Sequence, residues 1–289
     1  MGYFHNFHAP TQLCGRCINL ITPATMFSDT PHIPSDIWMM LDSEAKRINS
    51  PQFILADPVQ FPRRYSKLQD IEIAALLSAT IAWGNRKMIC RNADRMLAIM
   101  GHDPYNFVME GAYEEIPDGN IHRTFFSKNL RHFLRGLHRI YSRHGSLNDF
   151  AKHVHAAASE LPSWTLVEHM NHELREANNG TDDSRCLPLN LKATALKRVN
   201  MALRWLVRDD GIVDMGVWNA LTPSQLFIPL DVHVGNTARS LGLISRNAND
   251  KRTVLELTGI LRDHRPQDPV WYDYALFGIG VGHPAQDEV

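Results

Sequence analysis

The sequence predicts an all-α protein. Several windows repeat apolar residues at spacings of three and four, which is the period of one face of a helix. No window alternates apolar and polar residues convincingly, as a half-buried strand would, and no internal repeat is present. The clearest helical window spans residues 127–144, and its apolar stripe consists of Leu130, Phe133, Leu134, Leu137 and Tyr141.

The N-terminal half is expected to form helices separated by breaks. Ser35 or Asp36 caps the first of them. Residues 51–69 are expected to be irregular, because two prolines interrupt a stretch rich in Arg and aromatic residues. The segment 71–83 is apolar nearly all round, so it belongs in the middle of a bundle. Further helices are expected over 86–100 and over 147–172, the latter broken at Pro162.

The C-terminal half follows a polar stretch, residues 173–184, which is the best candidate for a linker. Beyond it, helices are expected over 190–208, from Asp231 to about 241, over about 251–262 and within 270–278.

These elements predict one helical domain over residues 33–283, built as two lobes with a cleft between them. The lobes are expected at about 33–172 and 186–283, joined by a linker at 173–185. Residues 1–32 look unlike the rest of the chain and are expected to be a disordered or mis-annotated extension.

The composition indicates a soluble globular protein. Of 289 residues, 44% are hydrophobic and 21% charged, and the formal net charge is −1. No apolar run is long enough to span a membrane and no secretory signal is visible, so we expect a cytoplasmic protein without a membrane partner. Because the net charge is close to zero, nucleic-acid binding would have to come from a local basic patch.

One such patch is a basic stripe on the predicted helix 127–144. It repeats at spacings of three and four, which places its members on one face. One interpretation is a surface that binds phosphates. The other is a solvated face whose charges are balanced by acids from elsewhere in the fold. The stripe consists of Lys128, Arg131, Arg135, Arg139 and Arg143.

The cysteines and histidines give little indication of a metal site. Cys14 and Cys17 lie near His5 and His8 and could bind zinc, although an over-extended reading frame starting before Met26 is the favoured interpretation. The His102–Asp103 pair is similar to the motif of HD phosphohydrolases, but no partner pair at helical spacing accompanies it. We expect no metal and no cofactor.

Asp231 and Lys197 are the candidate catalytic pair. Asp231 precedes a helical pattern, so it is a candidate N-cap, fixed by backbone N–H groups and favoured by the helix dipole. Lys197 lies 34 residues earlier, on a predicted helix whose residues 191–208 hold five Lys or Arg and no acid. They could form two halves of one site. The alternative is that Asp231 is only a cap and Lys197 only a surface lysine.

Two resemblances support the pairing. The segments 196–200 (LKRVN) and 229–234 (PLDVHV) resemble the helix–hairpin–helix DNA glycosylases, above all the archaeal 8-oxoguanine branch, in which a lysine opens one helix and an aspartate the next. This resemblance covers the C-terminal lobe. Most of the chain also resembles a bacterial family of conserved proteins of unknown function, through phrases such as DPVQFPRRY at 57–65 and DPVWYDYALFGIG at 268–280.

The glycosylase resemblance implies roles for these residues. A fixed carboxylate, Asp231, would stabilise the cationic sugar, and the amine of Lys197, or alternatively Lys192, would attack it. An extruded base would stack on a tryptophan. The residues 187–191 (LPLNL) lack the glycines of the hairpin that normally binds a DNA phosphate, so a backbone anion nest is harder to form there. The expected nucleic-acid contacts are Lys128, Arg131, Arg135, Arg139, Lys192, Arg198 and Arg204.

The expected function is therefore a DNA-repair N-glycosylase, with or without lyase activity, that removes a damaged base such as an oxidised purine. DNA is the expected partner and RNA the alternative; no protein partner can be inferred. Two other functions stay open at this stage. One is a non-catalytic nucleic-acid-binding module of the same fold, and the other is a helical protein that acts on a small anionic ligand.

Overall fold

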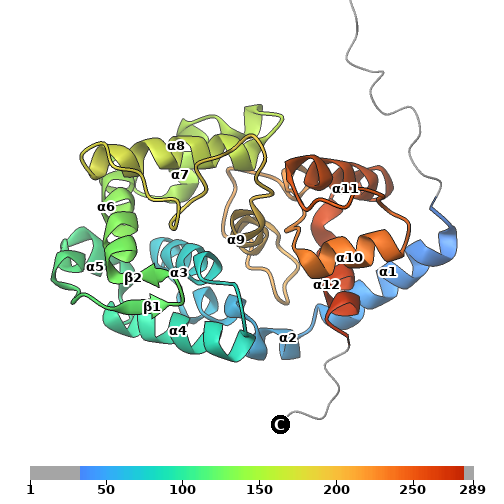
Figure 1. Ribbon diagram of the computed structural model, residues 1–289, viewed down its shortest axis with the longest axis horizontal. Coiled ribbons are helices and arrows are strands. Elements are labelled where there is room, and N and C mark those ends of the chain that lie inside the picture. The colour runs from blue at the N-terminus through green and yellow to red at the C-terminus, as the bar shows by residue number, and fades with distance from the viewer. Residues whose placement is uncertain (1–32, 283–289) are drawn as a thin grey trace, which may run out of the picture. The chain divides into compact units, whose positions relative to one another are not determined.

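The computed structural model describes residues 33–282, and its secondary structure confirms the all-α class (Figure 1). A two-stranded hairpin, β1 (Asn120–His122) and β2 (Phe125–Phe126), was not expected from the sequence. The helices in this part of the chain are α1 (Ser35–Ile48), α2 (Pro51–Ala56), α3 (Leu68–Thr80), α4 (Arg86–Ile99), α5 (Pro104–Met109), α6 (Ser127–His144), α7 (Leu147–His153), α8 (Pro162–Ala177), α9 (Lys197–Val207), α10 (Val232–Ser240), α11 (Lys251–His264) and α12 (Asp273–Gly280).

Local backbone chemistry explains where the observed bounds differ from the expected ones. Pro51 stands in the first turn of α2, where a missing N–H costs nothing, so a helix begins inside the stretch expected to be irregular. Helix α9 begins only at Lys197, because Leu196 has a left-handed backbone with φ of 50°. Helix α8 runs to Ala177, so the first residues of the predicted linker are helical. The predicted extension, with Cys14 and Cys17, lies outside the described residues.

Helix α3 has the central position that its apolar sequence predicts. Every residue from Asp70 to Thr80 is buried. The helix packs against α4, α5 and α9, and α6 packs against α8 and α5. A helix that is buried on all sides needs packing neighbours on every side, and α9 is one of these neighbours of α3.

The C-terminal helices form a second set of contacts. Helix α12 packs against both α10 and α1, so the first helix of the described chain lies beside the last ones (Figure 1). Helix α9 contacts α3 and α8. The division into two lobes stays a prediction. Within residues 33–282, no helix combines the length and the apolar character needed to cross a bilayer.

Glu72, on α3, joins three separate parts of the chain. Its fully buried carboxylate accepts hydrogen bonds from the backbone N–H groups of Leu147 and Asn148, both at 2.9 Å, from Tyr141 Oη at 3.1 Å and from Trp218 Nε1 at 2.8 Å. Burial raises the pKa of Glu72 to about 7, although the four donors oppose this shift. One side chain therefore fixes α6, α7 and the segment around residue 218 to the central helix.

This burial predicts a pH dependence of stability. Because the pKa of Glu72 is higher in the folded chain than in the unfolded one, the folded state is favoured when the group is protonated. The difference in unfolding free energy between wild type and Glu72→Gln should fall by about 3 kcal/mol as the pH rises from 4.5 to 7. Urea unfolding across this range measures it, and a difference that does not change with pH would contradict the prediction.

The α6–α8 contact predicts a steric effect. A Cβ on Gly136 would lie 3.0 Å from the Cα of Leu174 and closer still to its side chain, so Gly136→Ala should lower the unfolding free energy by about 2 kcal/mol. Gly259, on α11, has open space at the same point, and Gly259→Ala should instead raise it by up to about 1 kcal/mol. Chemical unfolding of both variants is the measurement. Equal effects would show that helix propensity alone decides the outcome.

Candidate active site

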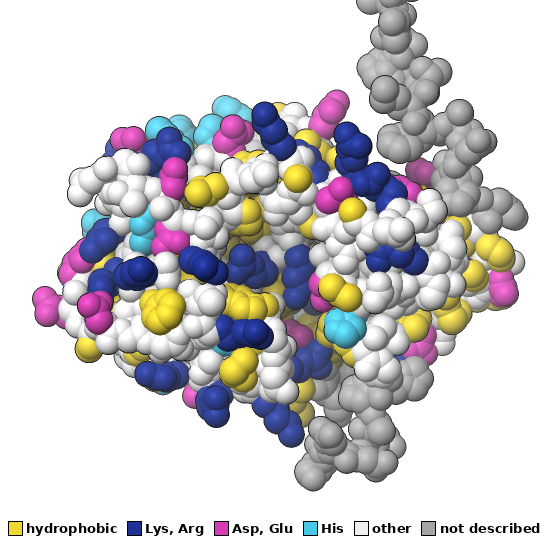
Figure 2. All heavy atoms as spheres, viewed as in Figure 1, with side chains coloured by type: hydrophobic (Ala, Val, Ile, Leu, Met, Phe, Trp, Pro, Cys, Tyr) yellow, Lys and Arg dark blue, Asp and Glu magenta, His cyan; other side chains and the backbone are white. Residues whose placement is uncertain are grey.

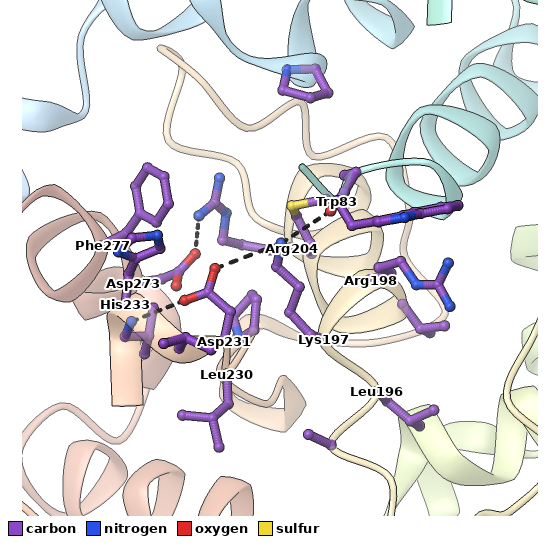
Figure 3. A pocket seen from close by; sticks show the side chains of 18 of the residues that line it. Trp83, Leu196, Lys197, Arg198, Arg204, Leu230, Asp231, His233, Asp273 and Phe277 are labelled. Carbon is purple, nitrogen blue, oxygen red and sulfur yellow. Dashed lines mark hydrogen bonds and ion pairs between the residues drawn. The ribbon is translucent and has the colours of Figure 1, made fainter. Parts of the chain in front are cut away.

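Asp231 is the N-cap of α10, as the sequence predicts. Its backbone is extended, and its Oδ1 atom accepts a hydrogen bond from the N–H of Val234 at 3.0 Å. Its carbonyl oxygen accepts a hydrogen bond from the side-chain amide of Asn249 at 3.2 Å. The carboxylate is therefore held in one orientation, and its second oxygen, Oδ2, faces the neighbouring cavity (Figure 3).

Lys197 is placed by a sharp turn at the start of α9. Leu196 is buried with φ of 50°, a conformation that costs a side-chain-bearing residue on the order of 1 kcal/mol. Two contacts hold the preceding loop: Trp164 Nε1 donates to the carbonyl of Thr194 at 3.2 Å, and the N–H of Lys251 donates to the carbonyl of Ala193 at 2.8 Å. The turn directs the side chain of the first helical residue into the cavity.

The structure brings Lys197 and Asp231 together. The Nζ atom of Lys197 lies 3.7 Å from Oδ2 of Asp231 and 3.4 Å from the carbonyl oxygen of Ala82. Their side chains are 29% and 20% exposed, so the pair is neither buried in the core nor fully solvated. Both residues line a cavity of about 1290 Å³ (Figure 3). Two groups distant in sequence thus meet in one accessible space, while their catalytic roles stay a prediction.

Two aromatic side chains, each next to an arginine, line opposite sides of the cavity (Figure 3). The guanidinium of Arg198 lies 5.3 Å from the ring centroid of Trp83, and that of Arg86 lies 5.2 Å from the ring of Phe277. Arg198 also donates to the carbonyl of Thr80 at 2.6 Å, and burial lowers the pKa of its guanidinium. Flat apolar surfaces next to positive charge suit a planar, anionic or electron-rich ligand.

A buried charge network lies behind the pair. Arg204, on α9, is 4% exposed and binds both Asp273, at the start of α12, and Asp214. Arg208 binds Asp214 as well. Burial raises the pKa of Asp273 to about 6; Arg204 opposes this shift, and the nearby carboxylate of Asp231 adds to it. Arg204 was predicted to contact nucleic acid. It lines the cavity, and two of its donors bind the carboxylates of Asp214 and Asp273, so that contact stays a prediction.

The predicted basic stripe lies apart from the cavity on α6. Arg131 pairs with Asp118 at 2.5 Å, Arg135 with Glu114 at 2.5 Å, and Arg139 with Glu173 at 2.7 Å. Arg143 also pairs with Glu173, at 3.3 Å. These contacts fit the interpretation in which acids from elsewhere balance the stripe. Lys128 and Lys192 are exposed and form no ion pair within residues 33–282. None of the stripe residues lines the cavity.

Several residues of the site could not be found from the sequence. Asp57 is a buried carboxylate in the cavity wall that accepts a hydrogen bond from the N–H of Val59 at 3.0 Å, and burial raises its pKa. Gly280 ends α12 against α10, where a Cβ would lie 2.9 Å from the carbonyl oxygen of His233. In the sequence, the Asp-Pro pair at 57–58 indicates a capped turn and does not indicate a cavity residue.

The tryptophans differ in their relation to the cavity. Trp83 lines it, whereas Trp205 and Trp218 are buried in the core. His233 lies at the cavity edge with Nδ1 3.2 Å from the carbonyl oxygen of Gly280. Among residues 33–282 no three His, Cys, Asp or Glu side chains are arranged to hold a metal ion.

Comparisons with known proteins leave the activity open. A family model described as "Protein of unknown function (DUF2400)" matches residues 57–282, a range that includes Asp57, Lys197, Asp231 and Gly280. No curated protein matches the chain, and no solved structure matches it either.

The geometry predicts that Arg204 and Lys197, two ion-paired residues of α9, contribute differently to the stability of the fold. Arg204→Gln leaves the buried carboxylate of Asp273 without its partner and Asp214 with Arg208 alone, and it should lower the unfolding free energy by about 3 kcal/mol or more. Lys197→Gln removes a half-exposed pair and should change it by less than about 1 kcal/mol. Urea unfolding of both variants is the test. A large loss in Lys197→Gln would mean that the Lys197–Asp231 pair serves the fold.

Proposed function

The chain belongs to this family of unknown function, and we propose that it is an N-glycosylase that removes a damaged base from DNA, with Lys197 as nucleophile and Asp231 as the stabilising carboxylate. The observation that carries the proposal is the meeting of an amine and a capped carboxylate, 3.7 Å apart, in a cavity with aromatic walls. A partly exposed ion pair that is held by a strained turn and a helix cap suits chemistry better than stability.

The proposed reaction passes through a positively charged sugar. Asp231 cannot rotate away, because the N–H of Val234 holds its Oδ1 atom. Its charge therefore stabilises the cation without reorganisation. As the bond between sugar and base breaks, the base leaves with the electron pair and takes up a proton.

Lys197 supplies the new bond. Its amine attacks the anomeric carbon as the base departs, and Asp231, next to it, is positioned to accept the proton that the amine gives up. Opening of the sugar ring then gives a Schiff base between Lys197 and the sugar. Loss of a proton from the adjacent carbon would expel the 3′ phosphate and nick the strand, which is the lyase version of the same reaction.

The cavity is suited to an extruded nucleotide. A base must leave the duplex to reach the pair, and it is then read by stacking and by contacts to its edge. Trp83 and Phe277 provide aromatic faces, and the volume of about 1290 Å³ is larger than most small-ligand pockets, so a base and its sugar can enter together.

Covalent trapping tests the proposal. Wild-type protein, incubated with borohydride and duplex DNA that contains an abasic site or 8-oxoguanine, should form a stable protein–DNA adduct. Lys197→Ala should abolish the adduct, and Asp231→Asn should slow base release roughly a hundredfold or more, since it removes the fixed charge. Electrophoresis of labelled DNA measures both results.

Lys192→Ala is the matched control, because Lys192 is an exposed lysine of the same basic segment. It should form the adduct at the wild-type rate. An adduct that persists in Lys197→Ala, or disappears in Lys192→Ala, would reject Lys197 as nucleophile. DNA binding with no adduct in any protein would instead favour a non-catalytic nucleic-acid-binding protein, and no binding at low salt would favour a small anionic ligand.

A further inference from the structure

The β1–β2 hairpin packs against Trp83, a residue of the cavity lining. The Nε2 atom of His122, on β1, lies 2.9 Å from the carbonyl oxygen of Trp83, and the two rings meet edge to face with centroids 4.7 Å apart. The other ring nitrogen of His122 bonds to the side-chain amide of Asn92 at 2.9 Å. This buried histidine therefore fixes the hairpin beside Trp83, which lines the cavity.

The tip of the hairpin places Arg123 at the cavity edge. Arg123 has φ of 51°, and Asn120 Nδ2 donates to its carbonyl oxygen at 2.6 Å, so the turn is closed by a side chain. Its guanidinium lies across Gly84, a residue of the cavity lining: a Cβ on Gly84 would come within 2.6 Å of Arg123 Nη1. The backbone at Gly84 thus leaves room for an arginine next to the opening.

A second arginine, Arg185, contacts the tip of the same hairpin. Arg185 Nη1 donates to Thr124 Oγ1, at the tip, with a distance of 2.9 Å. Arg185 is also the residue before Cys186, which lines the cavity. We call Arg123 and Arg185 the rim arginines. They come from segments far apart in the sequence, and each lies next to a residue of the cavity lining, Arg123 beside Gly84 and Arg185 beside Cys186.

The rim arginines differ in charge balance from the arginines of α6. Both are exposed, and neither forms an ion pair with a carboxylate within residues 33–282. On α6, by contrast, Arg131, Arg135 and Arg139 each have an acid partner. Figure 2 shows Lys and Arg side chains around the hollow in this face. Guanidinium groups without a counter-charge, next to a cavity, are available to bind an external anion.

We propose that Arg123 and Arg185 bind the phosphate backbone of the DNA strand whose nucleotide enters the cavity. A guanidinium group suits phosphate oxygens, because it can bind two of them with parallel hydrogen bonds. Residues 187–191, which lack glycine, are poorly suited to bind phosphate through backbone N–H groups, so side chains take over this task. The identity of the anion as DNA rests on the proposed function; the site itself rests on the hairpin geometry.

Binding as a function of salt tests the inference. Fluorescence anisotropy would follow a labelled duplex that carries a tetrahydrofuran abasic analogue, titrated with the full chain between about 50 and 200 mM KCl. The double variant Arg123→Gln/Arg185→Gln should bind roughly tenfold more weakly, and the slope of log K against log salt should fall by about two, since each phosphate contact contributes about 0.9. Glutamine keeps the Cβ, so the backbone strain at residue 123 is unchanged.

Arg135→Gln/Arg143→Gln is the matched control, because it removes the same charge from partly exposed arginines that already have acid partners. It should bind with the wild-type slope. Arg123→Lys/Arg185→Lys should recover most of the slope. The surface variants should melt within about 2 °C of wild type, which separates loss of binding from loss of folding.

The outcomes separate this inference from the proposed function. If the rim variant binds as wild type does, or the α6 variant loses the slope instead, the rim arginines are not the phosphate site, and the trapping result at Lys197 is unaffected. If wild type does not bind the duplex even at 50 mM KCl, the inference is overturned. If the rim variant loses affinity but wild type forms no covalent adduct, the inference holds and the glycosylase proposal fails.

Discussion

The contact between Arg204 and its two carboxylates determines how the site is assembled. A buried guanidinium requires compensation, and it finds this in Asp273, at the start of α12, and in Asp214, after α9. Helix α12 in turn packs against α10, whose N-cap is Asp231. Neutralisation of Arg204 therefore holds α12 against α9, and α12 in turn holds α10. The amine of Lys197 on α9 and the acid of Asp231 at the start of α10 are brought together in this way.

Three local structural features then determine the geometry of the site. The left-handed Leu196 orients the amine, the cap at Asp231 orients the acid, and His122 fastens the hairpin beside the aromatic wall. The arginines of α6 named above and the buried Arg204 have acid partners, whereas the rim arginines have none within residues 33–282; we call this the division of positive charge. Net charge alone, at −1, concealed this division.

The sequence predicts local features well and non-local ones poorly. The bounds of helix 127–144 and the capping role of Asp231 are confirmed, because apolar periodicity and cap chemistry act over a few residues. The start of α9 is wrong in the prediction, since nothing in the sequence indicates that a leucine takes a left-handed backbone. The acids that pair with α6, such as Glu114 and Glu173, lie 21 to 34 residues from their partners, where single-sequence patterns do not reach.

The close approach of α10 and α12 at Gly280 has a consequence for related chains. Hydrogen is the largest substituent that fits between the last turn of α12 and the carbonyl of His233. An alanine at this position would push the first turn of α10 outward and carry the acid at its cap away from the amine. A homologue with a larger residue there can keep every charged group of the cavity and still have lost the spacing on which their joint action depends.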